Sequence, residues 1–322
     1  MSDLPPEFAL IGRHFRPLAG AGALGLTDDA AVLAPPAGRE LVIAADAMVA
    51  GVHFLEDDPP ETIGRKLLRV NLSDLAAMGA APLGYLMTTA FPKGIDDGWI
   101  AHFAAGLAAD QREFGLSVLG GDTVGTPGPM SLSLTILGHA APGAALRRAG
   151  ARAGDDLWVS GSIGDGALGL RAARGQLPDP SGFLADRYRL PKPRVALGLA
   201  LVGIATAAMD VSDGLMQDLG HLCRASGCGA EVLADAVPLS DAARAAIAGD
   251  PALALLPFCG GDDYELLFAA PAAAVAAVQA AAAAAGIAAT RIGRFAAGAP
   301  AATLRDAKGA SVALPRAGWS HF

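Results

Sequence analysis

Short apolar segments alternate with longer segments of helical periodicity throughout this chain of 322 residues. Residues 97–114 are one example of a helical segment, because Ile100 and Phe103 recur on a single face. Strands and helices that alternate in both halves predict an α/β or α+β protein. In the first half we expect strands at residues 30–33, 41–45, 83–90, 117–119 and 131–138, and helices at 5–16, 60–78 and 97–114.

A change of composition near the middle of the chain predicts two domains. Residues 139–155 are dense in Ala, Gly and Arg, which is typical of a boundary segment. We therefore expect an N-terminal domain over residues 1–140 and a C-terminal domain over 150–322. In the second half we expect strands at 157–160, 231–233, 266–268 and 290–295, helices at 167–174, 193–208 and 215–225, an alanine-rich helix before the last strand, and a surface loop at 175–193.

The composition excludes several classes of protein. A hydrophobic content of 52% with 17% charged residues indicates a globular chain, not a disordered one. The net charge of −8 argues against binding nucleic acid, which requires a basic surface. The apolar stretches 195–209 and 269–289 are too short or too rich in alanine for a membrane span. Without a signal peptide, and with an odd number of cysteines that fit no zinc spacing, we expect a cytoplasmic protein.

Five short segments place aspartates beside small residues, next to a predicted strand or at the start of a helix. None contains a Lys or Arg, and carboxylates that converge without a partner repel one another. Mg²⁺ resolves that conflict, because it takes oxygen ligands and is commonly held by carboxylates together with substrate phosphates. The pattern therefore predicts a metal site that also holds phosphate. The five segments are Thr27–Asp29, Ala45–Ala47, Asn71–Asp74, Gly120–Asp122 and Asp210–Gly214.

Residues 210–214 carry the strongest of these signals. Asp210 and Asp213 lie three positions apart at a predicted helix start, where Ser212 and unpaired N–H groups can meet a phosphate. Simple N-capping by Asp or Ser is the alternative. Each of the other segments, taken alone, is equally consistent with a turn.

Glycine-rich segments give weaker signals. Residues 20–25 match G-x-G-x-x-G, but a helix precedes them instead of a strand, which excludes a dinucleotide site. Residues 161–166 follow a strand and precede a helix, so a phosphate contact and a plain tight turn both stay open. The chain has no P-loop and no protein-kinase motif.

Taken together and in order, these motifs resemble the thiamine-monophosphate kinase family, within the superfamily of aminoimidazole ribonucleotide synthetase and selenophosphate synthetase. The resemblance runs nearly from end to end of the chain. It rests on residues 28–33, 49–54, 70–80, 120–123, 210–215, 260–266 and 318–322.

The resemblance implies two domains of mixed β-sheet with packed helices, a dimer formed through the N-terminal domains, and ATP-dependent phosphorylation of thiamine monophosphate with several Mg²⁺ ions. By position, the implied metal ligands are Asp29, Asp46, Asp74, Asp122, Asp210 and Asp213, with Ala44 and Ala45 through their backbone. The implied ATP contacts are Gly121, Asp122, Arg148 and Ser212. The implied contacts to thiamine phosphate are His53, Asp262 and Trp319, whose ring offers a face to a cation.

The chain departs from the family pattern at three places. Thr27 stands where Gly is usual, Ala44 and Ala45 stand where a hydroxyl residue is common, and Asp262 replaces a Glu. Backbone carbonyls or waters then have to substitute for the missing hydroxyl ligands.

The many aspartates suit a reaction between two phosphates. An acceptor that is already anionic needs no strong base, and the main barrier is repulsion between polyanions, which metal ions neutralise during in-line transfer. Two alternatives are another ATP-dependent reaction of the same superfamily and a non-catalytic nucleotide or metal sensor. Selenide chemistry favours a cysteine near the N-terminus and carbamoyl chemistry one at the C-terminus, whereas the first cysteine here is Cys223 and the chain ends in His321 and Phe322.

Overall fold

A computed structural model describes residues 6–320, so the start of the first predicted helix and the motif residues His321 and Phe322 lie outside it. The chain divides into two compact units. The first contains the residues up to Leu75 and Ala81–Gly143, and the second contains Ala76–Ala80 and the residues from Ala144 onward. Across residues 6–320, no helix combines the length and the apolar character that crossing a membrane requires.

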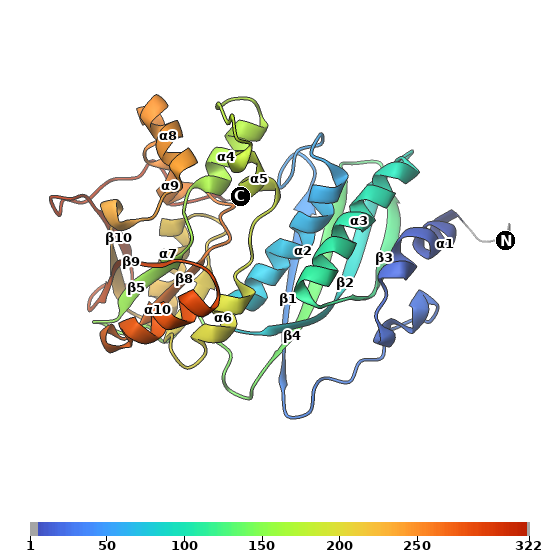
Figure 1. The fold of residues 1–322 in the computed structure, drawn as a ribbon, viewed down its shortest axis with the longest axis horizontal. Helices are drawn as coiled ribbons and strands as arrows, with labels where there is room; N and C mark the ends of the chain where they lie inside the picture. Colours follow the sequence, from blue (N-terminus) through green and yellow to red (C-terminus); the bar gives the residue numbers. More distant parts are fainter. Residues whose placement is uncertain (1–5, 321–322) are drawn as a thin grey trace. The chain divides into compact units, whose positions relative to one another are not determined.

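The first unit is a four-stranded mixed sheet with helices on one face (Figure 1). The strand order is β1-β4-β2-β3, in which β2 and β3 are parallel and the other pairs are antiparallel. The strands are β1 (Glu40–Val49), β2 (Ala81–Pro92), β3 (Val118–Thr126) and β4 (Ser131–Ala140), and the covering helices are α2 (Pro60–Ala77) and α3 (Asp97–Phe114). The predicted helices 60–78 and 97–114 are therefore confirmed.

Local signals define the ends of α3. The Asp96 carboxylate accepts the N–H of Trp99 at the N-terminus, and Gly115 ends the helix in a left-handed conformation. The apolar stripe of Ile100, Phe103 and Leu107 is buried. Sequence and packing agree here, which explains the accuracy of the predicted bounds.

The segment before β1 differs from the prediction. Helix α1 (Pro6–Leu10) is followed by a π-helical turn at Ile11–Phe15 and by 3₁₀ turns at Arg16–Leu18 and Ala21–Leu26. The expected strand at residues 30–33 is absent, since the segment lies beside no other strand and Val32 is exposed. An apolar run without a pairing partner does not form a strand.

The second unit has a six-stranded sheet of order β10-β7-β9-β5-β8-β6. Its strands are β5 (Asp156–Ser160), β6 (Ala207–Asp210), β7 (Gly229–Leu233), β8 (Leu266–Ala270), β9 (Ala289–Ala296) and β10 (Ala302–Arg305). Its helices are α4 (Asp165–Ala173), α5 (Phe183–Arg189), α6 (Val195–Leu201), α7 (Leu215–Ser226), α8 (Asp241–Gly249), α9 (Leu256–Cys259) and α10 (Val275–Ala284).

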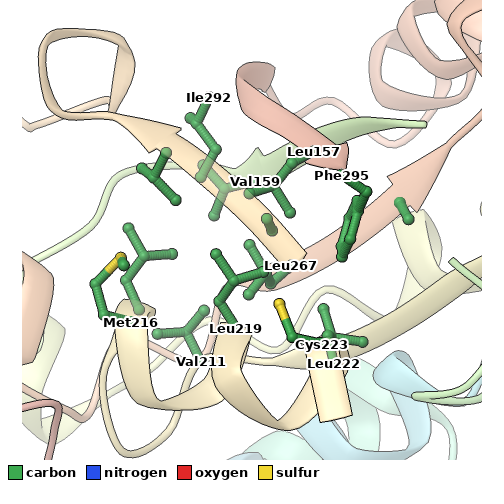
Figure 2. Close-up of a cluster of buried hydrophobic side chains, with 14 of the residues drawn as sticks. Leu157, Val159, Val211, Met216, Leu219, Leu222, Cys223, Leu267, Ile292 and Phe295 are labelled. Carbon is green, nitrogen blue, oxygen red and sulfur yellow. The ribbon is translucent and has the colours of Figure 1, made fainter. Parts of the chain in front are cut away.

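Apolar clusters cover both faces of this sheet. On one face Leu219 and Leu222 of α7 pack against Leu157, Leu267 and Ile292 of the strands (Figure 2). On the other face, α6 and α10 pack against the stacked rings of Trp158 and Phe268. The buried face of α7 positions the loop that precedes the helix, which carries Asp213 and follows Asp210, the last residue of β6.

Three predictions for the second unit are wrong. Residues 207–210 form β6 instead of extending a helix, because their pairing with β8 outweighs the helix propensity of alanine. The expected surface loop contains α5, whose Leu184 is buried and whose Arg187 forms a buried ion pair. Helix α8 was not predicted, although Ser240 caps it by accepting the N–H of Ala243.

Candidate active site

The first unit has a cavity on the side of the sheet that α2 and α3 leave open. Its volume is about 720 Å³. Thr88 and Ser133 from the sheet form part of its floor, and Phe8 and Leu26 from the N-terminal segment form part of its wall. It brings together five residues from the acidic motifs, namely Asp28, Asp29, Gly120, Gly121 and Asp122.

Gly121 and Asp122 lie within β3, where the sequence predicted a turn after a shorter strand. An added Cβ at Gly121 would stand 1.7 Å from the carbonyl oxygen of Met87, so only glycine fits this register. The Asp122 carboxylate accepts the N–H of Thr123, and the residue is exposed. Because Asp122 is exposed beside this close contact of two paired strands, a ligand in the cavity can reach its carboxylate.

Asp46 and Asp74 lie at a different place in the same unit. The N–H of Asp46 on β1 donates to the Asn71 side chain of α2 at 3.1 Å, and Asp74 follows Asn71 by one helical turn. Ala44 and Ala45 stand opposite Ile136 and Thr135 in the same strand pairing. Asn71 thus ties the strand with Asp46 to the helix with Asp74. This role of Asn71 is not visible in the sequence, because the contact joins two elements that are distant along the chain.

The sheet separates Asp46 from Asp122 within one copy of the unit. Their strands form its opposite edges, three strand spacings or roughly 14 Å apart. Asp46 stands opposite the buried Leu134, whereas Asp122 stands opposite the exposed Thr88, so the two side chains point to different faces. Among residues 6–320, no three His, Cys, Asp or Glu side chains gather closely enough to hold a metal ion.

In the second unit Asp210 ends β6, and Ser212 and Asp213 lie on the loop between β6 and α7. A single carboxylate oxygen of Asp218 accepts the N–H groups of Ser212, Asp213 and Gly214, each at 3.0 Å. The prediction that N–H groups of this segment are open to phosphate is therefore wrong for these three. Burial raises the pKa of Asp218 to about 7, and the Asp210 and Asp213 charges add to this effect.

Residues 260–265 lie against this loop. The N–H of Asp262 donates to the Ser212 carbonyl and that of Tyr264 to the Val211 carbonyl, each at 2.8 Å. Asp262 adopts a φ of +70°, a conformation that is uncommon outside glycine. These two hydrogen bonds place Asp262 beside the loop that carries Ser212 and Asp213.

Asp263 fixes the turn at residues 161–166. Its buried carboxylate accepts the N–H groups of Gly164 and Gly166 at 2.8 and 3.0 Å, and burial raises its pKa to about 8. Those N–H groups bond within the protein, which favours the tight-turn interpretation of this glycine-rich segment.

Trp319 also contacts the loop that carries Asp213. The backbone N–H of Trp319 donates to the Asp213 carbonyl at 2.9 Å, and the Trp319 carbonyl accepts a hydrogen bond from the Gln217 amide at 2.6 Å. The residue is 43% exposed, and the Arg316 guanidinium lies 5.9 Å from the ring centre. The second unit therefore unites four predicted site residues, namely Ser212, Asp213, Asp262 and Trp319.

Arg148 and His53 complete the predicted set. Partial burial and the charges of Arg224 and Arg148 lower the pKa of His221 while Asp213 opposes them, so Arg148 and Asp213 share one neighbourhood. His53 belongs to the first unit, where its Nδ1 accepts the N–H of Val49 at 3.0 Å. His53 is thus fixed near the end of β1, four residues beyond Val49, the last residue of that strand.

Comparisons with known proteins assign the chain to a family. The family descriptions "AIR synthase related protein, N-terminal domain" and "AIR synthase related protein, C-terminal domain" match residues 27–140 and 152–304. A thiamine-monophosphate kinase of Caulobacter vibrioides is 46% identical over 322 residues, covering 98% of this chain and 91% of that protein. The chain belongs to the thiamine-monophosphate kinase family.

Solved structures of the thiamine-monophosphate kinase family share the fold. The crystal structure of the Stenotrophomonas maltophilia K279a enzyme is 41% identical with a TM-score of 0.83, and the match covers 92% of this chain and 94% of that one. A second structure, "AaThiL complexed with AMPPCP and TMP", is 28% identical with a TM-score of 0.78. The match covers 92% of this chain and 91% of the chain in that structure. The predicted family, the two-domain α/β (α+β) fold class and the kinase class are confirmed.

Proposed function

We propose that this chain transfers the γ-phosphate of ATP to thiamine monophosphate and forms thiamine diphosphate. Membership of the thiamine-monophosphate kinase family supports the assignment, as does a relative described in complex with AMPPCP and TMP. The observation that carries it is the hydrogen bond between Trp319 and Asp213. This hydrogen bond holds an exposed tryptophan beside carboxylates. The aromatic side chain can bind a cationic ring, and the carboxylates can bind phosphates through metal ions.

Magnesium fits the chemistry of the donor set. All the implied side-chain ligands are carboxylates, which are the oxygen ligands that Mg²⁺ prefers. Burial raises the pKa of Asp218, and the charges of Asp210 and Asp213 add to the rise, so these carboxylates lie close to one another. In this proposal the metal-holding residues are Asp29, Asp46, Asp74, Asp122, Asp210 and Asp213, with backbone oxygens of Ala44 and Ala45. Bound Mg²⁺ would neutralise the phosphates that meet during transfer.

The remaining residues bind and orient the two substrates. Gly121, Asp122, Arg148 and Ser212 would contact ATP. Trp319 and Asp262 would contact the thiamine part and its phosphate together with His53. The ring of Trp319 already has a guanidinium near it, which supports its role as a partner for a cation.

The acceptor oxygen needs no general base. A phosphate monoester is anionic near neutral pH, so positioning and charge neutralisation account for most of the catalysis. We propose direct in-line transfer for this reason.

We also propose a homodimer formed through the first unit. The open face of its sheet presents Leu41, Ile43 and Leu86, and Ile43 is 60% exposed. An apolar sheet face of this kind is typical of a surface that a partner covers. Three buried free cysteines, Cys223, Cys228 and Cys259, are consistent with the reducing cytoplasm.

The test is ADP release from ATP and Mg²⁺ with a panel of acceptors, namely thiamine monophosphate, thiamine and water. Among these acceptors we expect turnover only with thiamine monophosphate, and we expect that turnover to stop after addition of a chelator. Equal ADP release without thiamine monophosphate would favour another reaction of the superfamily, and no release with any acceptor would favour a sensor.

A further inference from the structure

We propose that Gln217 is a positioning residue that sets the substrate-binding Trp319 in register with the Asp213 carboxylate. The proposal rests on the function proposed above. It concerns a residue of α7 that carries none of the implied ligand roles.

Gln217 lies in the first turn of α7, which begins at Leu215. Its side-chain nitrogen donates to the Asp213 carboxylate at 3.2 Å and to the Trp319 carbonyl at 2.6 Å. Both partners are acceptors, so the amide must present its NH₂ group to them, and each of its two hydrogens has one partner.

A third hydrogen bond closes this arrangement. The N–H of Trp319 donates to the backbone carbonyl of Asp213 at 2.9 Å. Three residues, two of them 102 positions apart, are thus linked in a ring of hydrogen bonds. The neighbouring Gly318 adds to the fit, because a Cβ there would stand 2.6 Å from the Gln217 Cβ.

The chemistry of this position selects a neutral amide. A glutamate would repel the Asp213 carboxylate and would offer no hydrogen to the Trp319 carbonyl. An aliphatic residue would leave both acceptors without this donor. Glutamine fixes the direction of the carboxylate and leaves its charge available, as groups behind a metal ligand commonly do.

The experiment compares Gln217→Ala with Gln279→Ala. Gln279 is a matched control, because its amide donates to the Ala289 carbonyl in another part of the second unit. Steady-state kinetics on the full chain would give separate KM values for thiamine monophosphate and ATP. Hydrogen exchange of residues 316–320, without substrates, would report whether the Trp319 N–H stays bonded.

For Gln217→Ala we expect the KM for thiamine monophosphate to rise about tenfold and the KM for ATP to change less than about twofold. We also expect faster exchange at residues 316–320, and neither effect in Gln279→Ala. Gln217→Glu keeps the size of the side chain and should raise the same KM, which covers the case in which Gln217→Ala fails to fold.

Unchanged kinetics and exchange in Gln217→Ala would overturn the proposal. A higher KM without faster exchange would also overturn it, since Gln217 would then act in some other way. If the wild-type chain shows no turnover with thiamine monophosphate, the proposed function fails, while the exchange measurement still decides whether Gln217 holds the Trp319 segment.

Discussion

Asp218 lies behind Asp213 and accepts its backbone N–H at 3.0 Å, through the same oxygen that also binds the N–H groups of Ser212 and Gly214. One buried carboxylate therefore shapes the whole loop that carries the implied metal and ATP contacts. Removing this carboxylate would leave three backbone donors without their partner.

Asp218→Ala should lower the free energy of unfolding by about 2–4 kcal/mol, because buried donors would lose their acceptor. Urea denaturation measures this change. Asp218→Asn keeps an acceptor oxygen and should cost less, and an equal loss in both variants would show that charge, not hydrogen bonding, is what the loop requires.

Gly121→Ala should destabilise the first unit by about 2–4 kcal/mol, since the added Cβ cannot stand 1.7 Å from the Met87 carbonyl oxygen. Gly125→Ala in the same strand is the control, because nothing lies within 4 Å of a Cβ at that position. Thermal unfolding of both variants tests this. Equal stability of Gly121→Ala and Gly125→Ala would contradict the close contact between Gly121 and Met87 of the neighbouring strand.

Asp263 should make the protein less stable as the pH rises. Burial raises the pKa of this carboxyl from 3.8 to about 8, against the opposing effect of the Gly164 and Gly166 N–H groups; Asp165 adds to the rise and Arg187 opposes it. The folded state then holds a proton that the unfolded state releases, so the contribution of Asp263 is full below about pH 4 and declines up to about pH 8.

Urea midpoints of the wild type and Asp263→Asn, measured between pH 5 and 8, test this effect. The asparagine variant cannot release a proton, so its stability should fall less steeply over that range. Parallel curves for the two proteins would show that Asp263 is ionised in the folded state.

Trp319→Ala should raise the KM for thiamine monophosphate by about 2- to 30-fold, the range that a cation–π contact spans, and leave the KM for ATP nearly unchanged. Trp319→Phe should recover part of the loss, since it retains an aromatic face. Trp99→Phe, in the first unit and stacked on Phe103, serves as the control. Full activity of Trp319→Ala at low substrate concentration would show that the Trp319 ring does not contact the substrate.

Local signals explain how much of the fold is predictable. The bounds of α3 follow from Asp96, Gly115 and an apolar stripe, all of which are visible in the sequence. The strand at Ala207–Asp210 is not visible, because its alanines favour a helix until β8 offers a partner. Pairing between distant segments decides such cases.

The same distinction applies to the site. The aspartates stand out in the sequence because they lie beside small residues in segments that contain no Lys or Arg, and the structure places Asp213, Asp262 and Trp319 together. The supporting roles of Gln217 and Asp218 depend on contacts with the loop and the C-terminal segment that only the folded chain makes. The separation of Asp46 from Asp122 likewise follows from strand order, which the sequence does not reveal.

The most direct test of the central claim is ADP formation from ATP by the wild type and by Asp74→Asn and Asp213→Asn, with thiamine monophosphate and Mg²⁺ and then with a chelator added. The account predicts turnover that the chelator abolishes and a loss of more than about a hundredfold in both variants, with unchanged circular dichroism. Turnover that survives the chelator, or full activity in either variant, would contradict it.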